Sequence, residues 1–141
     1  LFLGRPEMFA ALVAALPYTL TVFAAGAVLG TLRVLWLAPR LGEGDAILLE
    51  VPVMLAVSFL VARAVVRWRR VPARLGPRLL MGAAAFALLQ GAEAALAIGA
   101  FGRTLAEHLA TIAAPARLPG LAAQAVFAAM PALLLLGPAR R

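Results

Sequence analysis

Four polar side chains interrupt long apolar stretches of this chain, and their types could support chemistry. They are Arg33, Glu50, Gln90 and Glu93. Glu50 follows Asp45 by five residues, and Glu93 follows Arg78 by fifteen. At a helical rise of about 1.5 Å per residue, the two glutamates lie about 7 and 8 Å below one surface of a layer about 30 Å thick. We therefore expect the four residues to form one polar cluster inside a helical bundle.

Such a cluster could bind and release protons. Burial and a neighbouring like charge both favour the protonated form of a carboxyl group. Because one arginine cannot neutralise two carboxylates, we expect Glu50 or Glu93 to carry a proton at neutral pH. The alternative is a structural ion pair between Arg33 and one glutamate that fixes the register of the helices. Glu50 could also be a helix cap, if its helix begins near Val51.

The remaining residue types offer little other chemistry. The chain has no cysteine, which excludes disulfides, thiolate metal sites and cysteine nucleophiles. It has no glycine-rich phosphate loop and no zinc-protease or serine-hydrolase motif, and Ser58 has no nearby base. His108 is the only histidine, and we expect it to be an ordinary surface residue, with a ligand or a pH sensor as the alternative. We expect no metal ion, no cofactor and no catalytic residue.

Four apolar runs must position the polar residues. A helix needs about 20 mostly apolar residues to cross a bilayer. The runs cover residues 8–37, 46–66, 79–101 and 119–136. We expect the first helix to stop at Pro39, whereas Pro119 suits the first turn of the fourth. The pattern predicts an all-α fold, a four-helix bundle that forms a single transmembrane domain over residues 1–141.

A cleaved signal peptide is the alternative for the first run. Its apolar stretch is longer than the usual core of about 7–15 residues, and Glu7 dilutes the positive charge that precedes it. A spanning helix is therefore the better interpretation of this run.

Composition supports the membrane class. The chain has 141 residues, of which 65% are hydrophobic and 13% are charged. Soluble domains are about half apolar and about a quarter charged, so the surrounding medium must be lipid. The net charge of +7 would suit nucleic acid, but the arginines stand at the ends of apolar runs. We expect no nucleic-acid partner. The use of arginine without lysine, among abundant Ala, Gly and Pro, is typical of a GC-rich bacterium.

The placement of the arginines predicts the orientation. With four spans, nine arginines fall on one side of the membrane and four on the other. The nine are Arg5, Arg63, Arg67, Arg69, Arg70, Arg74, Arg78, Arg140 and Arg141. Because cytoplasmic loops concentrate positive charge, we expect both termini in the cytoplasm of a bacterium and the chain in its inner membrane.

A short helix is expected between the third and fourth spans. Thr104 and Glu107 have the spacing of a capping box, which satisfies free amides at the start of a helix. Leu105, Leu109 and Ile112 then share one face. The pattern predicts an amphipathic helix on the outer membrane surface that ends before Pro115.

Small residues are candidates for helix packing, because helices in lipid associate by close approach. Gly26 and Gly30 form a GxxxG pair in the first run. The third run carries small residues at every fourth position, namely Ala83, Ala87, Gly91, Ala95 and Gly99. We expect internal packing as their use, with a homodimer as the alternative.

One stretch of the chain resembles a family of short, four-span bacterial membrane proteins. The residues that carry the resemblance are Leu29–Arg33, Ala38–Gly42, Leu49–Met54, Met81-Gly82 and Ala92-Glu93. The resemblance implies four spans, but it brings no activity, cofactor or substrate. Small multidrug transporters have a similar size, but they bear an essential glutamate in the first span, which this chain lacks.

Two functions compete. The first is a non-enzymatic accessory or scaffold subunit that contacts membrane lipid and acts through its helix faces, in a homodimer or a larger membrane complex. The second is a small proton-coupled transporter or channel, homodimeric, with a path lined by Glu50, Glu93, Gln90 and Arg33. An enzyme acting on lipid head groups, with Glu93 as its base, is a weaker third.

Overall fold

The computed structural model describes residues 4–137, and the described chain is helical with no strand. The long helices are α1 (Arg5–Leu32), α3 (Glu43–Trp68), α4 (Leu75–Ala95) and α6 (Leu118–Leu133). The shorter elements are the π-helical turn η1 (Arg33–Leu37), α2 (Ala38–Leu41), the π-helical turn η2 (Leu96–Ala100), α5 (Leu105–Ala113), and the 3₁₀ turns η3 (Pro115–Arg117) and η4 (Leu134–Leu136).

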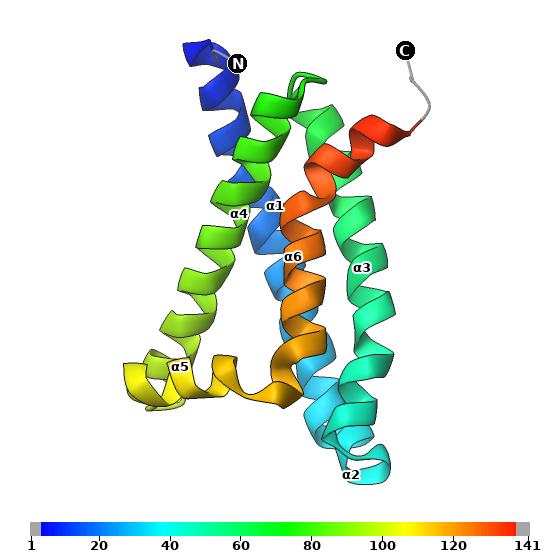
Figure 1. Cartoon of the computed structure of the whole chain (residues 1–141), viewed down its shortest axis with the longest axis vertical. Coiled ribbons are helices and arrows are strands. Elements are labelled where there is room, and N and C mark those ends of the chain that lie inside the picture. The colour runs from blue at the N-terminus through cyan, green and yellow to red at the C-terminus, as the bar shows by residue number, and fades with distance from the viewer. Residues whose placement is uncertain (1–3, 138–141) are drawn as a thin grey trace.

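The long helices run alternately up and down (Figure 1). The start of α1, the loop between α3 and α4 and the end of α6 lie at one end of the bundle, which we call the loop end. The helices α2 and α5 lie at the opposite end, which we call the α5 end, and α5 runs across the bundle there. Because the four long helices alternate in direction, the start of α1 and the end of α6 fall at the same end of the bundle.

Four helical segments are long and apolar enough to cross a membrane. They are Arg5–Leu41, Glu43–Trp68, Leu75–Ala100 and Pro115–Leu136. These segments overlie the four runs expected from the sequence, and the described chain has no competing strand. Four candidate membrane-spanning helices indicate a multi-pass membrane protein.

The expectation that Pro39 ends the first helix is wrong. The helical path continues through η1 into α2 and stops only at Leu41. Pro39 falls in the first turn of α2, after the hydrogen-bond register has shifted at η1, and proline needs no amide hydrogen in a first turn. Gly42 then reverses the chain with a φ of 87°, a conformation that glycine adopts readily, and α3 begins at the next residue.

The core lies at the centre of the bundle and takes residues from all four long helices, α1, α3, α4 and α6. Tyr18 and Met81 are completely buried, and so are the alanines at positions 11, 14, 15 and 85. The helices α4 and α6 approach each other closely, because a Cβ at Gly82 would overlap the carbonyl oxygen of Ala128 and lie 2.9 Å from its carbonyl carbon. The absence of a side chain at Gly82 therefore sets the spacing of these two helices.

The small residues singled out in the sequence do not fill this contact. Ala83, Ala87, Gly91, Ala95 and Gly99 are all exposed, and a Cβ added at Gly91 or Gly99 would meet nothing within 4 Å. The expected internal packing by Ala87, Gly91 and Ala95 is therefore wrong within this chain. The face that α4 turns inward carries Met81, Gly82, Ala85 and Leu89, and small residues at regular spacing could not reveal which face that would be.

The glycine pair of α1 contributes more modestly. A Cβ added at Gly26 would lie 3.5 Å from Cε of Met54, which is ordinary contact with α3. A Cβ added at Gly30 would meet only Nη2 of Arg33, at 3.8 Å, on the next turn of the same helical path. Neither glycine therefore brings two backbones together as Gly82 does.

The proline inside α6 is accommodated by a side chain of α1. Pro131 has no amide hydrogen, which leaves the carbonyl of Phe127 without its helical donor. The hydroxyl of Tyr18 donates to that carbonyl oxygen at 2.6 Å, and the two aromatic rings stack with centroids 4.4 Å apart. Arg78 of α4 donates to the carbonyl of Pro131 itself at 3.0 Å. These contacts tie α6 to α1 and to α4.

Candidate functional site

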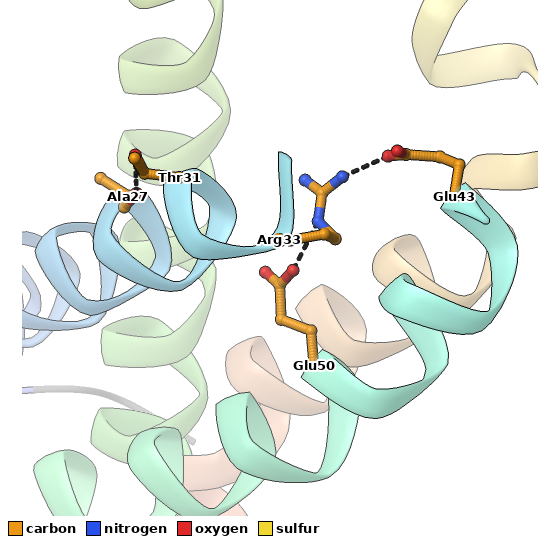
Figure 2. A network of polar contacts seen from close by, with 5 residues as sticks. All are labelled: Ala27, Thr31, Arg33, Glu43 and Glu50. Carbon is orange, nitrogen blue, oxygen red and sulfur yellow. Dashed lines mark hydrogen bonds and ion pairs between the residues drawn. The ribbon is translucent and has the colours of Figure 1, made fainter. Parts of the chain in front are cut away.

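Arg33 is the centre of a charged network at the α5 end (Figure 2). Its Nε donates to Oε2 of Glu50 at 2.6 Å, and its Nη1 donates to Oε1 of Glu43. The two glutamates are seven residues apart on α3, so they share a face and bracket the guanidinium. Arg33 and Glu50 are largely buried, with 16% and 18% of their side chains exposed, whereas Glu43 is 56% exposed.

The start of α3 decides between the two interpretations of Glu50. The helix begins at Glu43, so Pro52 lies inside it and Glu50 lies well beyond its first turn. A cap role for Glu50, with the helix beginning near Val51, is therefore wrong. Glu50 is instead a charged residue within a candidate span, neutralised by a partner from the preceding helical segment.

A second polar network joins α4 to α6. Nε2 of Gln90 donates to Oε1 of Gln124, and Nε2 of Gln124 donates to Oε1 of Glu93, both at 2.7 Å. Nη2 of Arg117, from η3, lies 3.9 Å from the other carboxylate oxygen of Glu93. Nε of Arg117 is buried with no acceptor among the described residues. The Arg117–Glu93 contact is thus longer and looser than the Arg33–Glu50 contact.

The four residues expected to form one cluster are therefore divided between two networks. Arg33 and Glu50 are in contact, whereas Gln90 and Glu93 belong with Gln124 and Arg117. The two networks are apart because the helices separate sideways. Towards the α5 end, α1 leads into α2 beside α3, whereas α4 leans to the opposite side of the bundle (Figure 1). Counting residues gives depth along a helix, but it does not show where two helices diverge.

The division changes the expected charge balance. Arg33 is shared by Glu43 and Glu50, whereas Glu93 has its own arginine and an amide donor from Gln124. The argument that one arginine must serve Glu50 and Glu93 together therefore does not hold.

Three members of these networks were not foreseen. Glu43 precedes the second apolar run, which begins at residue 46, but its spacing of seven residues from Glu50 aligns the two because α3 begins at Glu43. Gln124 is the one polar side chain in the fourth apolar run, which was a usable signal. Arg117 precedes that run and gave no signal beyond its charge.

The α5 helix begins at the predicted place, but the described residues form only one of the two hydrogen bonds of the predicted capping box. The hydroxyl oxygen of Thr104 accepts a hydrogen bond from the backbone amide of Glu107 at 3.1 Å. The expectation that His108 is a surface residue is wrong, because it is 9% exposed, while Leu105 and Leu109 face outward. His108 therefore lies on a covered side of α5, and α5 contacts both η2 and η3. In the part of the chain that the structure describes, no three metal-binding side chains gather.

No protein family, curated protein or solved structure matches this chain, so its function must be argued from its own geometry.

Proposed function

We propose that this chain is a bacterial inner-membrane protein that acts as a non-enzymatic accessory or scaffold subunit. It crosses the membrane four times with both termini in the cytoplasm, and it associates through the outer face of α4 with a second copy or with a larger membrane complex. The observation that carries the proposal is the row of five small residues that α4 and the following turn η2 leave exposed.

This row suits association inside a membrane. Lipid tails are as apolar as leucine, so helices in a bilayer associate by close backbone approach rather than by hydrophobic burial. Ala83, Ala87, Gly91, Ala95 and Gly99 recur at every fourth position and leave a shallow face. Because Gly91 and Gly99 meet no atom of the same chain there, that face is open to a helix from another chain.

The ion pairs and hydrogen bonds of the two intramembrane glutamates support a structural role without catalysis. Glu50 is paired with Arg33, and Glu93 accepts from Gln124 beside Arg117. An intramembrane charge that is paired and hydrogen-bonded can hold helices in register. Both glutamates are therefore assigned to the structure of the bundle.

A pair of matched substitutions tests the association. Gly91→Leu adds a bulky side chain to the outer face of α4 without a clash inside the chain, and Ala56→Leu does the same on the exposed face of α3. Crosslinking in native membranes, followed by mass measurement of the purified complex, should show that Gly91→Leu loses its partner while Ala56→Leu keeps it. Equal retention in both variants would contradict the proposal.

The transporter remains the second candidate because of the Gln90–Gln124–Glu93–Arg117 network. It leads from η3 at the α5 end to Gln90, which lies ten residues inside the end of its candidate span. Ten residues correspond to about 15 Å, half of a membrane core about 30 Å thick.

Reconstituted vesicles distinguish the two candidates. A transporter predicts pH-driven proton uptake that Glu93→Gln abolishes and that Glu50→Gln leaves largely intact, because Glu50 lies outside this network. A scaffold predicts no uptake in the unmodified protein. Uptake that survives Glu93→Gln would contradict a path through the network.

A further inference from the structure

The two ends of the bundle differ strongly in charge. The loop end carries Arg5, Arg63, Arg67, Arg69, Arg70, Arg74 and Arg78 against a single acid, Glu7. The α5 end carries Arg33, Arg40, Arg103 and Arg117 against Glu43, Asp45, Glu50, Glu93 and Glu107. The first end therefore has an excess of six positive charges among the described residues, and the second has an excess of one negative charge.

Some loop-end arginines are engaged within the protein. Nη1 of Arg74 contacts both carboxylate oxygens of Glu7, at 2.7 and 2.9 Å. Arg78 is buried and donates to the carbonyls of Pro72 and Pro131. In contrast, Arg67, Arg69 and Arg70 are exposed and form no ion pair with any described residue. Three adjacent guanidinium groups thus lack an anion at the end of α3.

Arg70 also has an unusual backbone. The amide of Val71 donates to the carbonyl of Val66 at 3.1 Å, and the amide of Arg70 donates to the carbonyl of Arg67 at 3.3 Å. This pattern is a Schellman motif, whose left-handed position usually holds glycine. Arg70 occupies it with a φ of 53°, although glycine would adopt this conformation without steric strain. A non-glycine residue in a backbone conformation that favours glycine suggests that its side chain has a function.

Trp68 places these arginines at the depth of lipid head groups. It is the last residue of α3 and of the second candidate span, and it is 66% exposed. Tryptophan prefers the interface between hydrocarbon and water. The guanidinium of Arg69 lies 5.3 Å from the centre of its ring. The site therefore combines an interfacial anchor with unpaired cations beside it.

We propose that Trp68, Arg67, Arg69 and Arg70 form a binding site for the phosphodiester head group of an anionic phospholipid. The site rests on the proposed membrane insertion, because it needs Trp68 at the lipid interface. Lipid is favoured over a soluble anion because the cations adjoin the last turn of a candidate span. Basic clusters beside spanning helices attract anionic lipid, with each arginine contributing a factor of about five in affinity.

The two tryptophans of the chain provide the experiment and its control. Trp36 lies at the α5 end with Arg40 5.3 Å from its ring centre, so it mirrors Trp68 and Arg69 in a setting without excess positive charge. The Trp36→Phe variant reports on Trp68 alone, and the Trp68→Phe variant reports on Trp36 alone. Each is reconstituted in phosphatidylcholine bilayers that contain brominated phosphatidylglycerol or, at the same fraction, brominated phosphatidylcholine, and tryptophan quenching is measured.

We expect brominated phosphatidylglycerol to quench Trp68 more strongly than brominated phosphatidylcholine, with no such preference at Trp36. In the Trp36→Phe background, Arg70→Gly should weaken the preference about fivefold, and Arg67→Gln should act similarly. Arg40→Gln should leave it unchanged. Arg70→Gly should not lower the unfolding temperature, because glycine suits the backbone there, so its loss of lipid preference cannot be due to unfolding.

The outcomes separate the lipid site from the membrane placement. An equal preference at the two tryptophans, or a preference at Trp68 that survives Arg70→Gly and Arg67→Gln, overturns the site while quenching itself still demonstrates insertion. If an added acidic soluble protein or nucleic acid displaces the brominated phosphatidylglycerol and so removes the quenching of Trp68, lipid is not the ligand of this site. No quenching of either tryptophan by any brominated lipid overturns membrane insertion, and the site falls with it.

Discussion

The hydroxyl of Tyr18 takes the place of a backbone amide that Pro131 lacks. Tyr18→Phe removes the donor and leaves the buried carbonyl of Phe127 unsatisfied, so we expect a loss of about 1–3 kcal/mol in the free energy of unfolding. Pro131→Ala restores an amide that can donate to the same carbonyl.

A double-mutant cycle tests this assignment. Tyr18→Phe should lower stability much less in the Pro131→Ala background than in the unmodified protein, as measured by denaturation in mixed micelles. Strictly additive effects would show that the hydroxyl and the proline are energetically unrelated, although they meet at one carbonyl.

The pair formed by Arg33 and Glu50 permits a second prediction for single residues. Removing one partner of a buried ion pair leaves the other uncompensated, which typically lowers stability by about 3–5 kcal/mol. Because Arg33 and Glu50 keep some exposure, we expect Arg33→Ala to lie near the lower bound, about 3 kcal/mol. Arg33→Ala combined with Glu50→Gln should be less destabilised than Arg33→Ala alone.

Glu43 supplies the matched control for that experiment. It contacts the same guanidinium but is 56% exposed, and exposed ion pairs contribute about 1 kcal/mol or less. Adding Glu43→Gln to Arg33→Ala should therefore recover little stability in the same unfolding assay. Equal recovery through Glu43 and Glu50 would mean that burial does not decide the strength of these contacts.

The packing of α4 against α6 gives a prediction for whole elements. Gly82→Ala would drive a methyl group into the backbone of Ala128, and two backbones cannot adjust as a flexible side chain can. We expect a loss of about 3 kcal/mol or more in the free energy of unfolding, with weaker association of α4 and α6. Gly91→Ala, on the outer face of the same helix, should be neutral or stabilising by up to about 1 kcal/mol, because alanine favours helix.

Denaturation of the two alanine variants in parallel measures both effects, and their opposite signs are the expected result. If Gly82→Ala and Gly91→Ala behaved alike, α4 and α6 would not be in the close contact that their backbones show.

For the whole molecule, the division of arginines between the two ends predicts the topology. Because the chain has no cysteine, single cysteines can be introduced at Arg70 and at Thr104, which lie at opposite ends of the bundle. In intact cells a membrane-impermeant thiol reagent should label position 104 and leave position 70 unlabelled until the cells are opened. Labelling of position 70 but not of position 104 in intact cells would show that the orientation is opposite to the predicted one. Labelling of both positions would contradict a spanning bundle.

The sequence by itself determined the helices and much of their ends. Apolar runs longer than a bilayer is thick leave backbone groups no partners except those within a helix, so the four long helices follow from composition. The cap at Thr104 and the first-turn position of Pro119 depend on neighbouring residues alone, and they too could be predicted. The prediction that the first helix ends at Pro39 was wrong because residue types do not reveal the shift in hydrogen-bond register at η1.

Tertiary structure alone decided which polar and small residues meet. The depth of Glu50 and Glu93 along their helices was calculable, but their partners depend on how α1 and α4 cross and diverge, which no spacing encodes. The same holds for Gly82 and for the outward row of small residues, because an apolar helix in an apolar medium has no polar side to reveal its inner face. Tyr18 and Phe127 are 109 residues apart, and only the packing of α1 against α6 unites the hydroxyl with the carbonyl that needs it.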